Sequence, residues 1–403
     1  MTERARSLFY LIAFPVGHFS VDTPGGALWL LAPAIGVAWD LSPAQIGFLI
    51  TAHNLGGGLA YLPFGIVGDR FSKRGPLLVM ALVWVAFGYL AASLAPSYWV
   101  LVVLLPVAAW GSAAWHPMAT GTMVQRMPKQ RALALGVHLT GGIMAEVIAP
   151  LSAGFLLNVM DWRTVLQISV VPAGIMSVSF LYLSRFVEPS SETAITRRDL
   201  LEVLEVWRHP PGIAMFVMGI TYNMSFIALL AMLPLFLQDH HGYSTSEAGI
   251  VFAVALLAGG VAAPVMGRYS DDIGRKRLLV GSMVVVGGAT ALIAFSGAAF
   301  PLILGAVIAG SLLVGARPVL LAAAVDMAGK RESTSLGLIY AVMDGVGALG
   351  GLLAGLAGSG DLRYAMVFAA AMALLTAVIA ALHPFGSAVR SFEPALDATD
   401  APA

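Results

Sequence analysis

The charged stretch G-I-V-G-D-R-F-S-K-R (65–74) recurs in altered form as G-R-Y-S-D-D-I-G-R-K-R (267–277), at an offset of 202 residues. Each copy lies between two long apolar segments and ends in a group of basic residues. A motif that repeats at such a distance indicates that the chain contains two copies of one structural unit.

Two further matches extend this repeat beyond the charged motif. S-P-A-Q-I-G (42–47) corresponds to S-T-S-E-A-G (244–249) at the same offset, and both have the Ser and Gln or Glu spacing of a helix capping box. Pro117 matches Pro318 at an offset of 201 residues. We therefore expect two halves of similar length and similar fold.

The composition places most of the chain in a membrane. Of the 403 residues, 59% are hydrophobic and 11% are charged, whereas a soluble domain has about 45–50% apolar and about 25% charged residues. A helix needs about 20 mainly apolar residues to cross the hydrocarbon. Twelve segments meet that requirement: 9–35, 45–67, 75–95, 98–124, 132–158, 164–184, 211–238, 247–266, 277–297, 300–325, 333–357 and 362–382. The predicted fold class is an all-α membrane protein with twelve transmembrane helices in two pseudo-symmetric six-helix bundles.

The longest polar interval between these segments, 185–209, divides them six and six. We predict an N-terminal bundle, a cytoplasmic linker with a short amphipathic helix at 199–208, a C-terminal bundle and a disordered cytoplasmic tail. Their boundaries are 1–184, 185–210, 211–385 and 386–403. The first apolar segment is longer than a signal peptide and contains His18 and Asp22, so we expect it to be retained.

The distribution of basic residues predicts the orientation. With the N-terminus, the even-numbered connections and the C-terminus on one side, that side holds 19 of the 22 Lys and Arg residues. Basic residues concentrate on the cytoplasmic side of membrane proteins. Both termini are therefore expected in the cytoplasm, and the protein in a bacterial-type inner membrane.

The charge balance and the missing residue types exclude several functions. Lys and Arg number 22 against 22 Asp and Glu, whereas nucleic-acid binding needs a concentrated basic surface. The chain has no Cys for a disulfide, a thiolate nucleophile or a Cys-based metal site, and no G-x-x-x-x-G-K-[ST] loop for ATP. We expect no enzyme activity, no cofactor and no metal site. The expected partners are a small-molecule substrate, protons and the lipid bilayer, and the expected state is a monomer.

The two charged motifs resemble the signature of the major facilitator superfamily, which lies between spans 2 and 3 of each half. Val67 and Ser72 depart from the Leu and Gly of that signature, and the second copy keeps Gly274. The resemblance covers nearly the whole chain and implies alternating access, with helices 3, 6, 9 and 12 as outer supports around a cavity. It also implies a cytoplasmic gate that holds the outward-open state, formed by Gly65, Asp69, Arg70, Arg74, Gly267, Asp271, Arg275 and Lys276. The alternative is that these charges only orient the chain.

A narrower resemblance is to the fosmidomycin-resistance exporters. It depends on four features: His18 followed by Asp22, L-S-P-A-Q-I-G (41–47), W-H-P (115–117) and A-L-A-L-G-V-H-L-T-G-G-I-M-A-E-V-I-A-P (132–150). In that group an acidic residue follows the His-Pro pair, whereas this chain has Met118 there. The resemblance implies drug efflux, but Met118 cannot take the proton role of that acid.

Ionisable residues within the predicted spans are candidates for proton coupling, because they are costly in lipid and usually face a cavity. The interiors of spans 3, 6, 9 and 12 contain no charged residue and no His. His18 and Asp22 are four residues apart and share a helix face, so they could bind and release a proton together or only fix helix packing. The predicted proton-coupling residues are Asp22, His18, Glu146 and Asp344.

Arg317 is the leading candidate for a substrate contact. It precedes Pro318 as His116 precedes Pro117, and proline can kink a helix in mid-membrane. A guanidinium suits a carboxylate or phosphate. The alternatives are an internal salt bridge with Asp344 or Asp22, or a position at the extracellular end of its span. The predicted substrate-binding residues are Arg317, His116, His53, His138, Asn223, Tyr222, Trp115 and Tyr340.

These features predict a secondary transporter that exports a small metabolite or drug in exchange for protons, with an anionic substrate as one candidate. One alternative is a proton-coupled uptake symporter or facilitator of an organic anion. A second is a lipid or lysolipid transporter. A third is a non-transporting scaffold or sensor, which would have little reason to retain buried charges.

Overall fold

The computed structural model describes residues 3–127, 130–189, 207–328 and 332–385, and these ranges are helical without a strand. The first half contains α1 (Glu3–Trp39), α2 (Pro43–Arg70), α3 (Gly75–Ser93), α4 (Tyr98–Arg126), α5 (Arg131–Leu156), α6 (Trp162–Leu183) and a 3₁₀ turn (Ser184–Phe186). The second half contains α8 (Pro210–Leu235), a π-helical turn (Phe236–His240), α9 (Thr245–Ile273), α10 (Arg275–Phe295), α11 (Ala299–Ala328), α12 (Glu332–Val346), α13 (Leu349–Ala357) and α14 (Arg363–Leu382).

Eleven helical spans of the described chain are long and apolar enough to cross a membrane. The predicted second span, α2, is not among them, because His53, Asn54 and several glycines lower its mean hydropathy. The predicted eleventh span, 333–357, contains α12 and α13, and its part Leu338–Ala357 is long and apolar enough to cross a membrane. With α2 included, all twelve predicted spans are helical, and the predicted all-α membrane fold is confirmed.

The two predicted capping boxes begin α2 and α9. The Ser42 hydroxyl accepts a hydrogen bond from the Gln45 backbone, and the Gln45 side chain accepts one from the Ser42 backbone at 2.9 Å. Ser244 and Glu247 make the same reciprocal pair, with the carboxylate 2.8 Å from the Ser244 nitrogen. Each box satisfies two backbone donors that a helix start leaves free, so both repeats begin a span in the same way.

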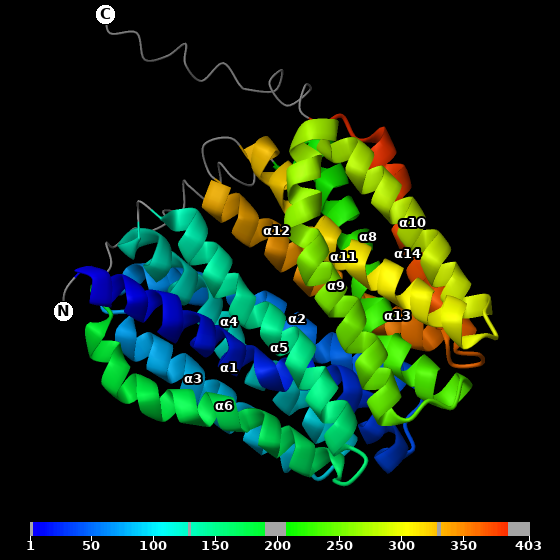
Figure 1. Cartoon of the computed structure of the whole chain (residues 1–403), viewed down its shortest axis with the longest axis horizontal. Coiled ribbons are helices and arrows are strands. Elements are labelled where there is room, and N and C mark those ends of the chain that lie inside the picture. The colour runs from blue at the N-terminus through cyan, green and yellow to red at the C-terminus, as the bar shows by residue number, and fades with distance from the viewer. Residues whose placement is uncertain (1–2, 128–129, 190–206, 329–331, 386–403) are drawn as a thin grey trace, which may run out of the picture.

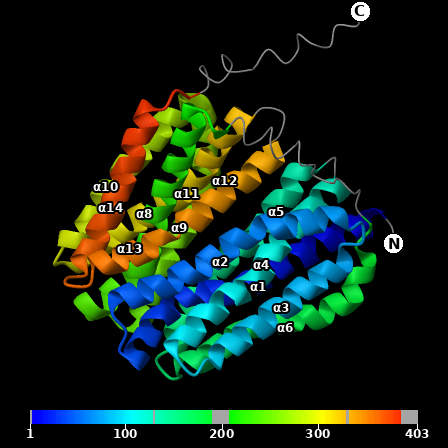
Figure 2. The ribbon, with the colours of Figure 1, turned by 180° about the vertical axis from the view of Figure 1, so that it is seen from behind.

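The helices form two bundles, α1–α6 and α8–α14 (Figures 1 and 2). α3 packs on α6 at the outer edge of the first bundle, and α10 packs on α14 at the outer edge of the second. Apolar side chains on these helices remain exposed, with Phe87 at 68% and Val178 at 70%. Such faces are expected on helices that contact lipid. The site between the bundles is therefore formed mainly by the inner helices.

The bundles meet at two interfaces that repeat each other, α2 against α13 and α5 against α9. A Cβ at Gly47 would collide with the carbonyl oxygen of Gly351, and a Cβ at Gly249 would lie 3.2 Å from the carbonyl oxygen of Pro150. Gly249 is the repeat equivalent of Gly47 at 202 residues, and Gly351 that of Pro150 at 201 residues. The internal repeat therefore extends to the way in which the halves touch.

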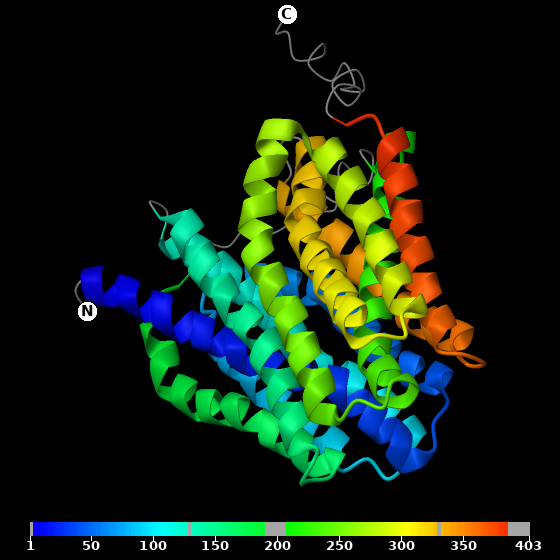
Figure 3. The ribbon, with the colours of Figure 1, turned by 45° about the vertical axis from the view of Figure 1, so that its right-hand side comes forward.

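The two ends of the molecule differ. At the far end, where α1 connects to α2 and α8 to α9, the two interfaces hold the bundles together, and Thr245 donates a hydrogen bond to the Asn158 side chain at 3.0 Å. At the terminal end, which carries the N-terminus and the last described residue, Phe385, the bundles spread apart (Figure 3). The predicted amphipathic helix at 199–208 lies almost wholly outside the described residues, as does the predicted tail at 386–403.

Candidate functional site: a polar cavity between the halves

A cavity of about 310 Å³ lies between the two bundles. Most of its wall is apolar, with side chains such as Ile143, Phe226, Leu256 and Val314. Eight ionisable side chains also line it: Asp22, His53, Tyr61, Tyr89, His116, Glu146, Arg317 and Asp344. Both halves contribute, so a molecule in this cavity would touch both.

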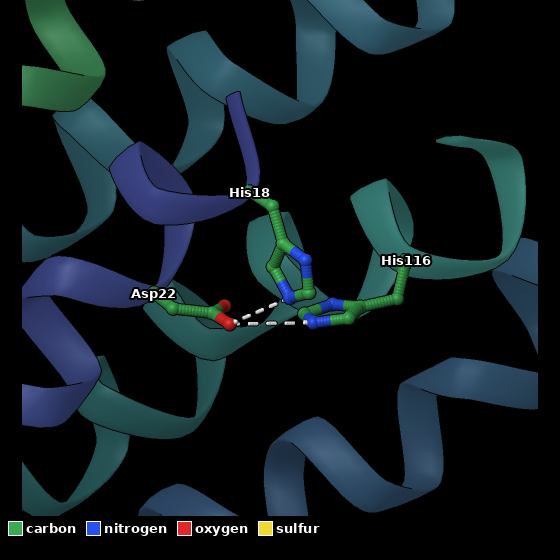
Figure 4. Close-up of side chains that lie close together, drawn as sticks. All are labelled: His18, Asp22 and His116. Atoms are coloured by element: carbon green, nitrogen blue, oxygen red, sulfur yellow. Dashed lines mark ion pairs between the residues drawn. The ribbon is translucent and has the colours of Figure 1, made fainter. Parts of the chain in front are cut away.

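Asp22 is the centre of a cluster that joins α1 to α4 (Figure 4). Its Oδ2 lies 3.0 Å from Nε2 of His18 and 3.4 Å from Nε2 of His116. Its Oδ1 accepts a hydrogen bond from the Ser112 hydroxyl at 2.7 Å. His18 is buried behind the carboxylate, whereas Asp22 and His116 face the cavity.

The second nitrogen of each imidazole determines how many protons this cluster can hold. Nδ1 of His18 lies 2.8 Å from the His138 carbonyl oxygen, and Nδ1 of His116 lies 2.6 Å from the Ser112 carbonyl oxygen. A carbonyl can only accept, so Nδ1 carries the hydrogen in both rings. If Nε2 also donates to Asp22, that ring is an imidazolium. Each contact with the carboxylate therefore has room for one additional proton.

The same three residues have the donor types of a metal site. Nε2 of His18, Nε2 of His116 and a carboxylate oxygen of Asp22 lie within 4.8 Å of one another. In the structure each Nε2 faces the carboxylate oxygen of Asp22, at 3.0 and 3.4 Å, and the site could bind either a proton or a cation there.

Glu146 of α5 lines the cavity next to the far-end interface. Its described hydrogen bond comes from the Trp29 indole, at 3.2 Å. The Trp29 ring lies 6.3 Å from that of Phe252, which belongs to the other half. Asp22 contacts two imidazoles, whereas Glu146 has no described contact with a His, Lys or Arg side chain.

Arg317 of α11 lies in an internal ion pair in this conformation. Its NH2 group is 2.8 Å from both carboxylate oxygens of Asp344 on α12. Its guanidinium carbon lies 5.7 Å from the ring centroid of Tyr340. The two charged side chains are 29% and 18% exposed, so the pair is accessible from the cavity.

The other predicted substrate residues divide into two groups. His53 and Asn223 line the cavity; His53 pairs with the Tyr89 hydroxyl at 2.6 Å, and Asn223 donates to the Met343 carbonyl at 2.9 Å. The remaining four are outside the set of lining residues: His138 stacks on His18, Trp115 packs between Phe14 and Phe180, the Tyr222 hydroxyl donates to the Leu313 carbonyl, and Tyr340 lies beside Arg317.

The described contacts of the predicted cytoplasmic gate residues lie within one half. Arg74 is buried and its Nε donates to the Gly68 carbonyl at 3.0 Å. Arg275 lies 3.0 Å from Asp326 and 3.9 Å from Asp271, and Lys276 donates to the His383 carbonyl at 3.1 Å. Arg70 is exposed, a Cβ at Gly65 would lie 3.8 Å from Pro117, and a Cβ at Gly267 would meet nothing within 4 Å. The Asp69 side chain lies outside the described residues. The gate stays a prediction, for a conformation in which this end is closed.

Sequence reasoning missed five polar groups that line the cavity: Ser112, Tyr61, Tyr89, Trp29 and Asn54. Ser112 could have been found, since it lies one helical turn before His116 on the same face. Tyr89 was missed because it belongs to α3, a helix that was expected to stand outside the cavity.

Two bundles of membrane-spanning length around one shared polar cavity define a transport protein. The chain matches the Major Facilitator Superfamily over residues 16–260 and again over 215–394, and it belongs to that family. It is a multi-pass membrane transporter of small molecules and not an enzyme.

Curated relatives are transport proteins of several kinds. A "putative metabolite transport protein" of Haemophilus influenzae is 24% identical over 68% of this chain and 71% of its own length. A "probable sulfoacetate transporter SauU" of Cupriavidus necator is 25% identical over 76% of this chain and 77% of its own. A "multidrug resistance protein MdtG" of Serratia proteamaculans is 27% identical over 55% of each chain. The superfamily prediction is confirmed, whereas the fosmidomycin-resistance group stays a prediction.

Solved structures show the same fold. A bacterial homologue of the human lysosomal transporter Spinster, described as inward-facing and unoccupied, superposes with a TM-score of 0.79 at 17% identity, over 96% of this chain and 98% of the other. The nucleoside transporter NupG, as a D323A mutant, superposes with a TM-score of 0.78 at 13% identity, over 93% and 97%.

Proposed function

We propose that this transporter exports a small metabolite or drug in exchange for protons, by alternating access. The observation that carries the proposal is the cluster of Asp22 with His18 and His116, in which three titratable groups converge beside the cavity. Multidrug and metabolite transporters among the relatives support export and a small substrate.

The orientation belongs to this proposal. The terminal end carries most of the basic residues, so it faces the cytoplasm of a bacterial-type inner membrane. The described conformation, closed at the far end, is then the one that receives a cytoplasmic substrate. The Gly65–Arg74 and Gly267–Lys276 segments would meet and close the cytoplasmic end in the opposite conformation.

The exchange follows from the charge of the Asp22 cluster. When the cavity opens outward, a proton from outside binds to the cluster, where two imidazoles and a carboxylate can share it. When the cavity opens inward, the cluster loses that proton to the cytoplasm and the cavity becomes more negative. A proton held in one conformation and released in the other drives the substrate in the opposite direction.

Arg317 supports a second candidate, a proton-coupled uptake symporter or facilitator of an organic anion. A carboxylate or phosphonate on the substrate could replace Asp344 as the partner of the guanidinium, since the pair faces the cavity. Asp344 would then have to take a proton or a new partner. The sulfoacetate transporter among the relatives is consistent with this candidate.

Purified protein in liposomes would test proton coupling. Thermal-stability screening against phosphonates, carboxylates, sugars and lipophilic cations would first identify a ligand. We then expect that ligand, added to one side, to move protons to that side, as reported by a pH-sensitive dye. Asp22→Asn should abolish proton movement. Asp361→Asn, which alters a partly exposed acid paired with Arg363 outside the cavity, should transport as the unchanged protein does.

Three outcomes would contradict this proposal. Full proton-coupled transport by Asp22→Asn would remove the cluster from the mechanism. Co-transport of ligand and protons in the same direction would favour the uptake symporter. Movement of labelled lysolipid, without any response to soluble ligands, would favour a lipid transporter.

A further inference from the structure

The eleventh span is broken where it passes the cavity. α12 ends at Val346 and α13 begins at Leu349. Between them the backbone bonds join residues three apart, from Ala348 to Gly345 at 3.3 Å and from Gly351 to Ala348 at 3.1 Å. A tightened turn within a span often marks a hinge, and a hinge has a physical cause that can be identified.

A side chain from the opposite half lies in this break. The hydroxyl of Thr51, on α2, donates to the Ala348 carbonyl at 2.7 Å and accepts from the Leu352 amide at 2.9 Å. Ala348 and Leu352 are four residues apart, so they are the acceptor and donor that an uninterrupted helix would join directly. Insertion of a side chain between such groups is a recognised cause of a sharp kink.

The repeat supplies an internal control for this cause. The position equivalent to Thr51 is Ala253 on α9, which is buried and has no hydroxyl. The segment equivalent to Ala348–Leu352 is 147–151 in α5, and there the helix is continuous despite Pro150. The span that faces a hydroxyl is broken, whereas the span that faces a methyl group is not.

The break also positions a charged residue of the site. Asp344 lies in the last turn of α12, where Asn223 donates to the carbonyl of the preceding residue, Met343, at 2.9 Å. The Asp344 carboxylate reaches Arg317 at 2.8 Å. The direction of this turn relative to α11 therefore determines whether the ion pair forms.

We propose that Thr51 is a positioning residue that couples the far-end interface to the Arg317–Asp344 pair. While the far end is closed, the Thr51 hydroxyl stabilises the break between α12 and α13, and Asp344 remains paired with Arg317. When the far end opens, α2 leaves α13 and the Leu352 amide bonds the Ala348 carbonyl directly. The span then straightens, and Asp344 turns away from Arg317. This inference rests on alternating access, but it requires no particular substrate and no proton step.

Spin-label distances would test it, and the absence of Cys from the chain makes labelling simple. One label pair, at the exposed Val159 and Phe300, reports on the far end. A second pair, at the exposed Leu133 and Tyr269, reports on the terminal end. Without ligand or pH gradient, Thr51→Val should shift the ratio of far-end-closed to far-end-open molecules by about tenfold toward the open form, because two hydrogen bonds are lost.

Two matched variants separate the hydroxyl from the packing. Thr51→Ser keeps the hydroxyl and should retain the distances of the unchanged protein. Thr51→Ala copies the residue of the other half and should behave as Thr51→Val does. A hydrogen-exchange measurement on the peptide that contains Leu352 should show stronger protection in Thr51→Val than in Thr51→Ser.

The outcomes also separate this inference from the proposed function. If the unchanged protein shows two distance populations and Thr51→Val leaves their ratio and the exchange at Leu352 unaltered, the role of Thr51 is wrong while alternating access stands. If the unchanged protein shows one population at every pH and ligand concentration, alternating access fails and this inference fails with it.

Discussion

The two halves share one fold but carry different chemistry at equivalent positions. His116 in the first half corresponds to Arg317 in the second, and Asp22 corresponds to Asn223. In the first half an acid on α1 contacts imidazoles on α1 and α4, whereas in the second a guanidinium on α11 contacts an acid on α12. Imidazoles can change charge near neutral pH, and a guanidinium cannot. We infer that the first half carries the proton and the second half binds charged groups of the substrate.

The largest effect on transport is expected when His116 of the first half is replaced by Arg, the residue at the equivalent position of the second half. His116→Arg removes one of the two imidazole contacts of Asp22 and places a permanent positive charge there, which disfavours a proton on Asp22 and on His18 as the cavity alternates. We expect proton-driven transport in liposomes to fall to the level of empty liposomes, while the protein still folds. His240→Asn, which removes an exposed His outside the cavity, should leave transport unchanged. Transport by His116→Arg that still responds to a pH gradient would show that the two halves do not differ in this way.

The second prediction concerns the ion pair of the second half. Arg317→Ala leaves the Asp344 carboxylate in the cavity wall without its cation, and we expect a loss of about 2–4 kcal/mol of stability, less than for a fully buried pair because both groups are partly exposed. Thermal unfolding in detergent would measure it.

The matched controls are a double variant and an exposed pair. Arg317→Ala with Asp344→Ala should recover most of the lost stability, because no unpaired charge remains. Arg363→Ala, which breaks an exposed pair with Asp361, should change the unfolding temperature little. If Arg317→Ala alone unfolds at the temperature of the unchanged protein, the pair contributes nothing to the described conformation.

A third and smaller effect is expected at the two glycine interfaces, which are similar but not equally tight. A Cβ at Gly47 would collide with a backbone carbonyl that cannot turn away, whereas a Cβ at Gly249 would lie at 3.2 Å from its carbonyl and needs only a small shift. Gly47→Ala should therefore oppose closure of the far end by about 1–3 kcal/mol, and Gly249→Ala by less. The same spin-label pairs would measure the ratio of closed to open molecules in both variants. An equal shift in the two variants would mean that the two interfaces are equally tight.

The sequence predicts the internal repeat and the positions of the charged residues within the spans, but it does not predict which helices bring their side chains into contact. The offsets of 201 and 202 residues predict that His116 and Arg317 occupy equivalent places, because chain connectivity preserves order within each bundle. No periodicity indicates that Arg317 contacts Asp344 rather than Asp22 or a substrate, because that choice depends on how α11 and α12 pack. The break between α12 and α13 was also unreadable, since its cause, Thr51, lies about 300 residues earlier and in the other half.

The segments that follow the last helix of each half also differ, in the opposite sense, and the smallest predicted effect lies there. After α6, Glu188 contacts Arg6 at 2.9 Å and Arg126 at 3.2 Å. After α14, the buried His383 instead pairs with the Pro211 carbonyl at 3.0 Å through Nε2. The segment after α6 is therefore stabilised by ion pairs at the surface, and the segment after α14 by the hydrogen bond of a buried His.

The buried His383 should make stability depend weakly on pH. Burial, with the nearby Lys276 ammonium, holds the pKa of His383 below its ordinary value of 6.5, although the contact with Pro211 opposes this shift. The folded protein thus binds the proton less readily than the unfolded chain, so this contribution to stability is complete above pH 6.5 and is lost as the pH falls through the folded pKa. His383→Asn can still donate to the Pro211 carbonyl but does not titrate. Between pH 7 and pH 5 we expect it to lose less stability than the unchanged protein, by about 1 kcal/mol or less, in thermal unfolding at each pH. An identical pH profile for His383→Asn would mean that His383 stays accessible to protons in the folded protein.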